Sequence, residues 1–159
     1  MIQIKNNING VEIRKPEKFS DQRGWLCELF RQDEIKDGKY PVMSYLSMTK
    51  PGVARGPHEH RFQTDYICFL GQSKFKMFLW DNRADSETFG DFFSFEIEEK
   101  SVVMLVIPPG VVHAYKNIGK IDGIILNAPD RLYAGVNREE AVDEIRYEEQ
   151  AECKFKIDK

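Results

Sequence analysis

The three histidines of this 159-residue chain all fall within two short motifs. His58 and His60 belong to Gly-Val-Ala-Arg-Gly-Pro-His-Glu-His at residues 52–60, and His113 ends Pro-Pro-Gly-Val-Val-His at residues 108–113. Histidine moves protons readily near neutral pH, and it is also the commonest metal ligand. The two motifs therefore predict one site, with either proton abstraction or metal binding as its chemistry.

Short strands separated by turns must position these motifs. Apolar or alternating segments recur between Gly- and Pro-containing turns, a pattern that favours β-strands. They cover residues 11–13, 25–30, 42–48, 65–70, 74–80, 91–97, 102–107, 113–117 and 123–126. Only residues 138–150, which are rich in Glu and Ala, indicate a helix. The pattern predicts an all-β sandwich or jelly roll with a short C-terminal helical segment.

Composition and charge exclude several classes of protein. The length favours one domain, residues 1–159, with a full hydrophobic core. The net charge of -3 argues against nucleic acid as a partner, and no apolar run is long enough to span a membrane. The N-terminus lacks the apolar region of a signal peptide. Cys27, Cys68 and Cys153 form no CxxC pair, so we expect no disulfide framework and a cytoplasmic location.

The second histidine motif matches the cupin pattern, Pro-x-Gly-x-x-His followed by Asn117, and the first motif matches it in part. This similarity implies a cupin jelly-roll barrel with the histidines facing its interior. Metal-binding cupins also carry a glutamate four or five residues after the second histidine, where this chain has Thr64 and Asp65. His58, His60, Asp65 and His113 would still suit Fe, Mn or Zn. We expect no metal and no cofactor, and a metal-dependent cupin enzyme remains an alternative.

Four segments, in chain order, resemble the dTDP-4-dehydrorhamnose 3,5-epimerases, a metal-free branch of the cupins. They are Phe-Ser-Asp-Gln-Arg-Gly-Trp-Leu-Cys-Glu at 19–28, Arg-Gly-Pro-His at 55–58, Asp-Asn-Arg-Ala-Asp-Ser-Glu-Thr-Phe-Gly at 81–90 and Ile-Pro-Pro-Gly-Val-Val-His at 107–113. The resemblance implies a homodimer in which N-terminal strands exchange between subunits. It also implies that the partner molecule is a nucleotide diphosphate sugar.

The resemblance also assigns roles to residues. It implies that His58 is the catalytic base and that Arg23, Glu28 and Arg55 contact the nucleotide sugar. His60, which is extra to the epimerase motif, is a second catalytic candidate. Further substrate-binding candidates are Arg83, His113 and Tyr133, although Arg83 could equally belong to a turn and His113 could be structural.

The chain departs from this family at three points. The catalytic tyrosine expected on the strand after the last histidine is absent from Ile124-Ile125-Leu126-Asn127, and the expected lysine is missing near Asp65. The C-terminal aspartate that pairs with the histidine has only Asp143 and Asp158 as candidates. The Arg-Gly-x-His-x-His motif also resembles sugar 3,4-ketoisomerases.

These observations together predict an isomerase that acts on a nucleotide-linked 4-keto-6-deoxy sugar in deoxysugar or polysaccharide biosynthesis. The 4-keto group acidifies the C3 proton. Because the catalytic tyrosine is missing, we expect a single, metal-independent epimerisation at C3 in place of a double 3,5-epimerisation. The alternatives are a ketoisomerase, the metal-dependent cupin and a sugar-binding cupin without catalytic activity.

Overall fold

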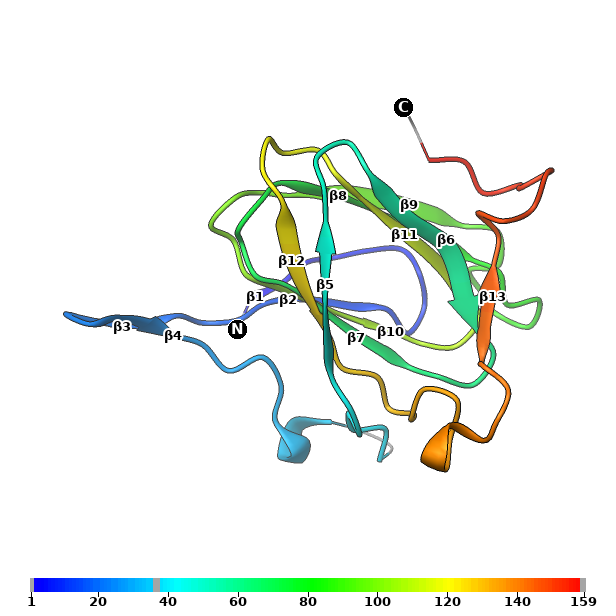
Figure 1. Ribbon diagram of the computed structural model, residues 1–159, viewed down its shortest axis with the longest axis horizontal. Helices are drawn as coiled ribbons and strands as arrows, with labels where there is room; N and C mark the ends of the chain where they lie inside the picture. Colours follow the sequence, from blue (N-terminus) through cyan, green and yellow to red (C-terminus); the bar gives the residue numbers. More distant parts are fainter. Residues whose placement is uncertain (1, 36–37, 158–159) are drawn as a thin grey trace.

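The computed structural model describes residues 2–35 and 38–157, and antiparallel strands make up most of its regular structure (Figure 1). The strands are β1 (Ile2–Gln3), β2 (Glu12–Lys15), β3 (Phe19–Asp21), β4 (Gly24–Leu26), β5 (Tyr45–Thr49), β6 (Ala54–His60), β7 (Asp65–Phe69), β8 (Phe75–Asp81), β9 (Phe92–Ile97), β10 (Val103–Ile107), β11 (Val111–Asn117), β12 (Gly123–Asn127) and β13 (Glu144–Arg146). Two 3-10 turns, η1 (Gln32–Glu34) and η2 (Val136–Arg138), complete the regular structure of the described residues. None of the helical segments in this described part could cross a membrane.

The strands form two large sheets that pack face to face. One sheet has the order β1-β2-β10-β7-β12-β5, and the other has the order β13-β6-β11-β8-β9. All pairings within them are antiparallel. Figure 1 shows β5 and β12 facing β6 and β13 across the interior. This arrangement confirms the expected all-β jelly roll.

Alternating side chains of these strands build the core. On β8, Phe75, Met77 and Leu79 enter the main hydrophobic cluster, as period-two alternation predicts. On β11, Val111 and Tyr115 join the same cluster. His113 lies between them in the sequence, on the same face of β11. The histidine therefore lies inside the barrel, with 1% of its side chain exposed.

The expected helix over residues 138–150 does not form, so this part of the prediction was wrong. Asn137 and Arg138 have positive φ angles of 55° and 63°, which are incompatible with an α-helix through this turn. The residues that follow form β13, which pairs with β6 from Glu144 opposite His60 to Arg146 opposite His58. Tertiary pairing thus outweighs the intrinsic helix propensity of Glu and Ala.

Two contacts on the outer face of the sheet hold this C-terminal segment in place. The Tyr147 hydroxyl donates a hydrogen bond of 2.7 Å to Glu59, whose side chain is buried beside it. Phe155 packs against Trp80 and Tyr147, with ring centroids 5.6 Å and 4.7 Å apart. These contacts fix the position of β13 at the edge of its sheet, beside β6.

The ribbon formed by β3 and β4 projects away from the barrel (Figure 1). The strand expected over residues 25–30 is shorter in the structure, because β4 stops at Leu26. Phe19, Trp25 and Leu26 on this ribbon are 53%, 53% and 63% exposed. Three large apolar side chains on one projecting element indicate a surface for another protein molecule.

Candidate active site

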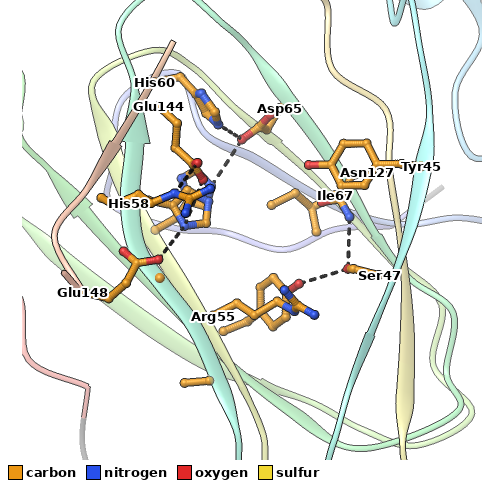
Figure 2. Close-up of a pocket in the computed structure, with 15 residues that line it drawn as sticks. Tyr45, Ser47, Arg55, His58, His60, Asp65, Ile67, Asn127, Glu144 and Glu148 are labelled. Carbon is orange, nitrogen blue, oxygen red and sulfur yellow. Dashed lines mark hydrogen bonds and ion pairs between the residues drawn. The ribbon is translucent and has the colours of Figure 1, made fainter. Parts of the chain in front are cut away.

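A cavity of about 360 Å³ opens between the two sheets at the histidine motifs (Figure 2). This volume lies within the range of small-molecule sites. The lining comes from both sheets and from the C-terminal segment, namely Tyr45, Ser47, Ala54, Arg55, Gly56, His58, His60, Asp65, Ile67, His113, Tyr115, Asn127, Glu144, Arg146 and Glu148. Most of these side chains are polar, so the cavity suits a polar ligand.

An irregularity in β6 brings Arg55 and His58 to the same cavity. Alternation along a regular strand would place residues three apart on opposite faces. Opposite β11, however, His58 pairs with His113 and Arg55 pairs with Tyr115, so β6 carries an extra residue between the two pairs. Gly56 lies at this bulge with φ +80°, and a Cβ there would come within 2.5 Å of the His113 carbonyl oxygen. Glycine is therefore required for the approach of the two strands.

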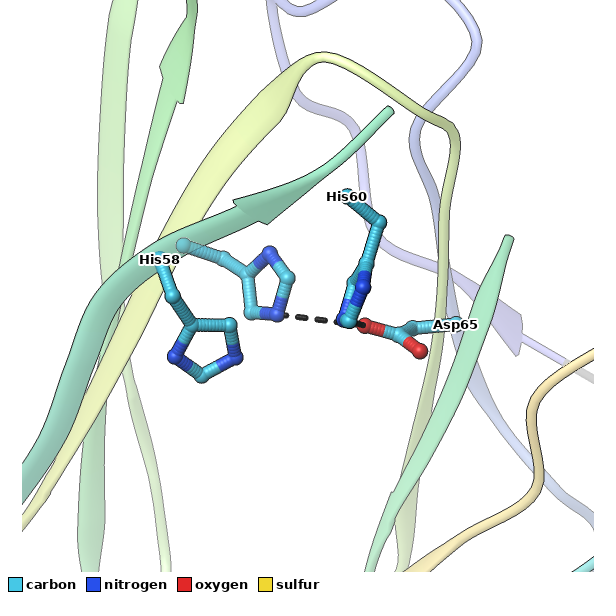
Figure 3. Close-up of side chains that lie close together, drawn as sticks. His58, His60 and Asp65 are labelled. Carbon is cyan, nitrogen blue, oxygen red and sulfur yellow. Dashed lines mark ion pairs between the residues drawn. The ribbon is translucent and has the colours of Figure 1, made fainter. Parts of the chain in front are cut away.

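Two of the three histidines contact the carboxylate of Asp65, and His58 lies beside them (Figure 3). Nε2 of His60 and Nε2 of His113 each lie 3.2 Å from Oδ2 of Asp65. The rings of His58 and His113 lie edge to face, with centroids 4.3 Å apart. The structure thus brings the histidines of both motifs together at one cavity.

The charges in this cluster are unequal. Burial lowers the pKa of His58 well below its ordinary value, and charge on His113 lowers it further. Burial also opposes charge on His60, but the contact with Asp65 outweighs it, and the pKa of His60 is raised. Burial would raise the pKa of Asp65, but the rings of His113 and His60 hold it far below its usual range. The cluster therefore combines a His58 that favours its neutral form, an ionised Asp65 and a His60 whose positive charge Asp65 stabilises.

His60 has three polar neighbours at its ring nitrogens. Nδ1 lies 3.3 Å from the backbone oxygen of Asp143, and Nε2 lies 3.2 Å from both Oδ2 of Asp65 and the side-chain amide nitrogen of Gln63. The charged form, in which both ring nitrogens donate, suits the two oxygens, whereas the Gln63 amide is itself a donor. The carboxylate of Asp65 therefore favours a positive charge on His60.

Two carboxylates that the sequence analysis did not single out lie beside His58. Oε1 of Glu144 is 3.9 Å and Oε1 of Glu148 is 4.0 Å from His58 Nδ1. Arg146, between them in the sequence, donates to Glu144 at 2.7 Å. Because a solvated helix was expected here, these residues were missed. The alternation Glu-x-Arg-x-Glu over residues 144–148 could have revealed them, because it places all three side chains on one face of an extended chain.

The two aspartates considered as histidine partners have other positions. The side chain of Asp143 accepts hydrogen bonds of 2.9–3.2 Å from the backbone amides of residues 61, 62 and 63. It therefore fixes the loop after β6 and does not pair with His58. Asp158 lies outside the described residues.

Arg55 is held at the cavity by two hydrogen bonds. Its Nε donates to Thr49 at 3.1 Å, and Nη2 donates to the Met48 carbonyl oxygen at 2.9 Å. Within the described part of the chain, Nη1 makes no hydrogen bond. A guanidinium fixed in this way has a donor available for a ligand oxygen.

Four predicted substrate-binding residues do not line the cavity of their own chain. Arg23 lies on the projecting ribbon and pairs with Asp21, with 85% of its side chain exposed. Glu28 pairs with Arg31. Tyr133 is 54% exposed on the segment after β12. Arg83 donates to buried Asp81 at 2.7 and 2.8 Å and to the backbone of Asn9, so its contacts are those of a structural turn.

The residues present also fit a metal in number and type. One ligand atom from each of His58, His60, Asp65 and His113 lies within 4.8 Å of the others. Three imidazoles and one carboxylate form a donor set that transition metals accept. The same cluster could thus serve proton transfer or hold a metal, and activity measurements must separate the two.

Comparisons with known proteins agree on one family. A family model described as dTDP-4-dehydrorhamnose 3,5-epimerase matches residues 5–137. The probable low-salt glycan biosynthesis epimerase Agl13 of Haloferax volcanii is 39% identical over 129 residues, which cover 80% of this chain and 81% of that protein. The spore coat polysaccharide biosynthesis protein SpsL of Bacillus subtilis is 35% identical over 113 residues, 71% of this chain and 74% of that protein.

A solved structure supports the fold over nearly the whole chain. The dTDP-4-dehydrorhamnose 3,5-epimerase of Sulfolobus tokodaii superimposes with a TM-score of 0.74 at 25% identity. The match covers 92% of this chain and 82% of that one. The family model ends at residue 137, so Glu144, Arg146 and Glu148 lie beyond the matched region.

Proposed function

Since this chain belongs to the dTDP-4-dehydrorhamnose 3,5-epimerase family, we propose that it epimerises a nucleotide-linked 4-keto-6-deoxy sugar at C3 during polysaccharide biosynthesis. The observation that carries this proposal is the half-buried His58 in a polar cavity, beside a second histidine that contacts the carboxylate of Asp65. Removal of a proton next to a ketone requires such a pair, a base and a group that stabilises the enolate oxygen.

His58 is the base in this reaction. Its lowered pKa keeps the imidazole neutral at working pH, so its lone pair is available to accept the C3 proton. Glu144 and Glu148, both about 4 Å from Nδ1, stabilise the imidazolium that then forms. The outer contact between Tyr147 and Glu59 holds these carboxylates in position.

His60 and Arg55 supply positive charge on the substrate side. The Asp65 contact favours protonated His60, whose positive charge can stabilise the enolate oxygen at C4. Arg55, fixed by Thr49 and Met48, is placed to bind an oxygen of the diphosphate. The sugar ring then lies between the two sheets.

The direct test of this function is conversion of a defined substrate. The dTDP-, CDP- and GDP-linked 4-keto-6-deoxy sugars are each incubated with the purified protein, and the products are separated by chromatography. One of them should give an isomer of unchanged mass. If all three emerge unaltered while each binds, the chain is a sugar-binding cupin and not an isomerase.

We further propose that the active enzyme is a homodimer in which the β3–β4 ribbon reaches the partner's cavity. The ribbon exposes Phe19, Trp25 and Leu26, and Arg23 has no role in its own cavity. A second copy of the chain would cover these apolar side chains and bring Arg23 to a substrate. Sedimentation analysis should give a dimer, and a monomer at enzymatic concentrations would contradict this arrangement.

Mixing two impaired variants, at a substrate concentration too low to saturate Arg23→Ala, tests whether Arg23 acts across the dimer. We expect Arg23→Ala and His58→Asn to be impaired alone and to regain activity when their subunits are exchanged. In the mixed dimer one cavity combines His58 of one subunit with Arg23 of the other. If mixing restores nothing although subunits exchange, Arg23 does not complete the partner's site.

Loss of either Arg23 or Arg55 should act on substrate binding. Each guanidinium can hold diphosphate oxygens bidentately, so Arg23→Ala and Arg55→Ala should each weaken affinity by roughly tenfold or more, about 1.4 kcal/mol. Binding should also become less sensitive to salt because fewer charges are involved. Calorimetry with dTDP at two salt concentrations measures both effects.

Unchanged affinity in both variants would refute the assignment. Lys120→Ala provides a control in which a charge is removed from a loop outside the cavity.

The donor set of the histidine cluster favours one other candidate, a metal-dependent cupin enzyme. We expect dialysis against EDTA to leave epimerase activity unchanged, because a nitrogen that donates its lone pair to a metal cannot also accept the C3 proton. Metal content measured with the activity provides the control. If activity disappears on chelation and returns in proportion to one added metal, His58 is a metal ligand and not the base.

A further inference from the structure

Inversion at C3 requires a proton donor opposite the base. The base removes the proton from one face of the sugar, and an acid must deliver a proton to the other face. The proposed function provides His58 for the first step and leaves the acid unassigned. Residues 124–127 on β12, where the family resemblance places a tyrosine, contain none.

The two faces of the cavity come from different sheets. His58 belongs to β6, on the sheet that also carries β11 and β13. The facing wall is formed by the sheet that contains β5, β7 and β12. Its lining residues are Tyr45, Ser47, Asp65, Ile67 and Asn127. A sugar ring bound between the sheets shows one face to His58 and the other to this wall.

Three polar members of the facing wall are unsuited to protonate carbon. Asn127 is an amide that donates to Ser47 at 3.3 Å, and an amide is not a proton donor to carbon near neutral pH. Ser47 is a weak acid, and its hydroxyl also lies 3.2 Å from the Tyr115 hydroxyl. Asp65 contacts two histidine rings and accepts a hydrogen bond of 2.7 Å from Gln63, so it acts as an acceptor.

We propose that Tyr45 is the general acid of this enzyme and delivers the proton to C3 from the face opposite His58. Figure 2 shows its hydroxyl pointing from β5 into the cavity, toward the wall that carries His58. Among the described residues, none forms a hydrogen bond with this hydroxyl, so the proton is available to a ligand. The assignment rests on the proposed function and names a residue for its second step.

The environment keeps the phenol protonated before the reaction. Partial loss of hydration in the cavity raises the pKa of Tyr45, and the negative charge of Asp65 raises it further. A protonated phenol can donate, whereas a phenolate could not. Tyr45 is also 47% exposed, so it can recover its proton from water after each turnover.

The epimerisation needs no cofactor, because His58, Tyr45 and water account for every proton and electron pair. His58 takes the C3 proton, and the electrons of the broken C–H bond form the enolate with its charge on the C4 oxygen. The enolate then takes the Tyr45 proton at C3, which restores the ketone and leaves a phenolate. Water reprotonates Tyr45, and His58 releases its proton to water.

Substitution of Tyr45 by phenylalanine should separate proton exchange from inversion. With a dTDP-linked 4-keto-6-deoxy sugar in deuterated water, proton NMR follows both the loss of the H3 signal and the appearance of the C3 epimer. Tyr45→Phe should retain exchange, because His58 can remove the proton and return a deuteron on the same face. Inversion should fall by at least about a hundredfold, the usual scale for loss of a general acid.

Tyr115→Phe is the matched control, since it removes the other tyrosine hydroxyl that lines the same cavity. We expect it to leave the ratio of exchange to inversion at the wild-type value, and thermal unfolding checks that both variants fold. If Tyr45→Phe inverts C3 at the wild-type rate, or loses exchange and inversion equally, Tyr45 is not the acid. If wild-type protein catalyses neither process with dTDP-, CDP- or GDP-linked substrates, the proposed function fails and this assignment with it.

Discussion

Replacement of His58 by asparagine is expected to lower turnover by at least about a hundredfold, the ordinary cost of losing a general base. Asparagine keeps a polar side chain of similar reach but cannot accept a proton. The fold should be retained, because the main hydrophobic cluster is built by residues of both sheets and does not include this partly exposed side chain. Steady-state kinetics and thermal unfolding measure the two effects, and near-normal turnover would contradict the assignment.

The pH profile provides an independent check on His58. Because its pKa is lowered by burial and by charge on His113, the base remains neutral as the pH falls through the ordinary histidine range. The rate constant kcat/KM should therefore stay level near pH 6.5 and decline only at lower pH. If kcat/KM instead begins to decline above pH 6.5, the pKa of the essential base in the free enzyme is not lowered, and the assignment to His58 is contradicted.

Replacement of Asp65 by asparagine should have the second large effect. The change removes the charge that favours protonated His60, so the enolate oxygen loses its positive partner. Loss of one group that stabilises an oxyanion costs about 10²–10³ in kcat in other enzymes. The pKa of His60 should fall at the same time, since burial then acts without opposition from Asp65.

Two measurements together distinguish this role of Asp65 from simple destabilisation. Nitrogen NMR of the histidine rings should show His60 titrating above pH 6.5 in wild-type protein and below it in Asp65→Asn. Asp130→Asn serves as a control, because that carboxylate accepts a backbone hydrogen bond from Thr64 outside the histidine cluster. An Asp65→Asn protein with unchanged kcat, or with an unshifted His60, would contradict the electrostatic account.

The sequence contained enough information for the sheets and the centre of the site. Period-two alternation predicted β8 closely, and an apolar run bounded by turns predicted β10. The spacing of His58 and His60 placed both on one face of β6. The Pro-x-Gly-x-x-His motif predicted the inward position of His113. These are local patterns, which one strand and its neighbouring turn determine.

The parts that could not be predicted depend on contacts between distant segments. Glu144 and Glu148 reach His58 only because residues 144–146 pair with β6 and Tyr147 bonds to Glu59, and composition alone suggested a helix there. Tyr45 faces His58 because two sheets pack against each other, which no local pattern reveals. The position of Arg23 away from its own cavity depends on a partner molecule that a single sequence does not describe.

The most direct test of the central claim is proton NMR of wild-type protein with dTDP-, CDP- and GDP-linked 4-keto-6-deoxy sugars in deuterated water. The account predicts that with one of these nucleotides H3 is replaced by deuterium, the C3 configuration inverts and the ketone remains at C4, while H5 exchanges more slowly or not at all. Movement of the ketone to C3 would identify a ketoisomerase. Retention of both H3 and H5 with every substrate would contradict proton abstraction by His58 altogether.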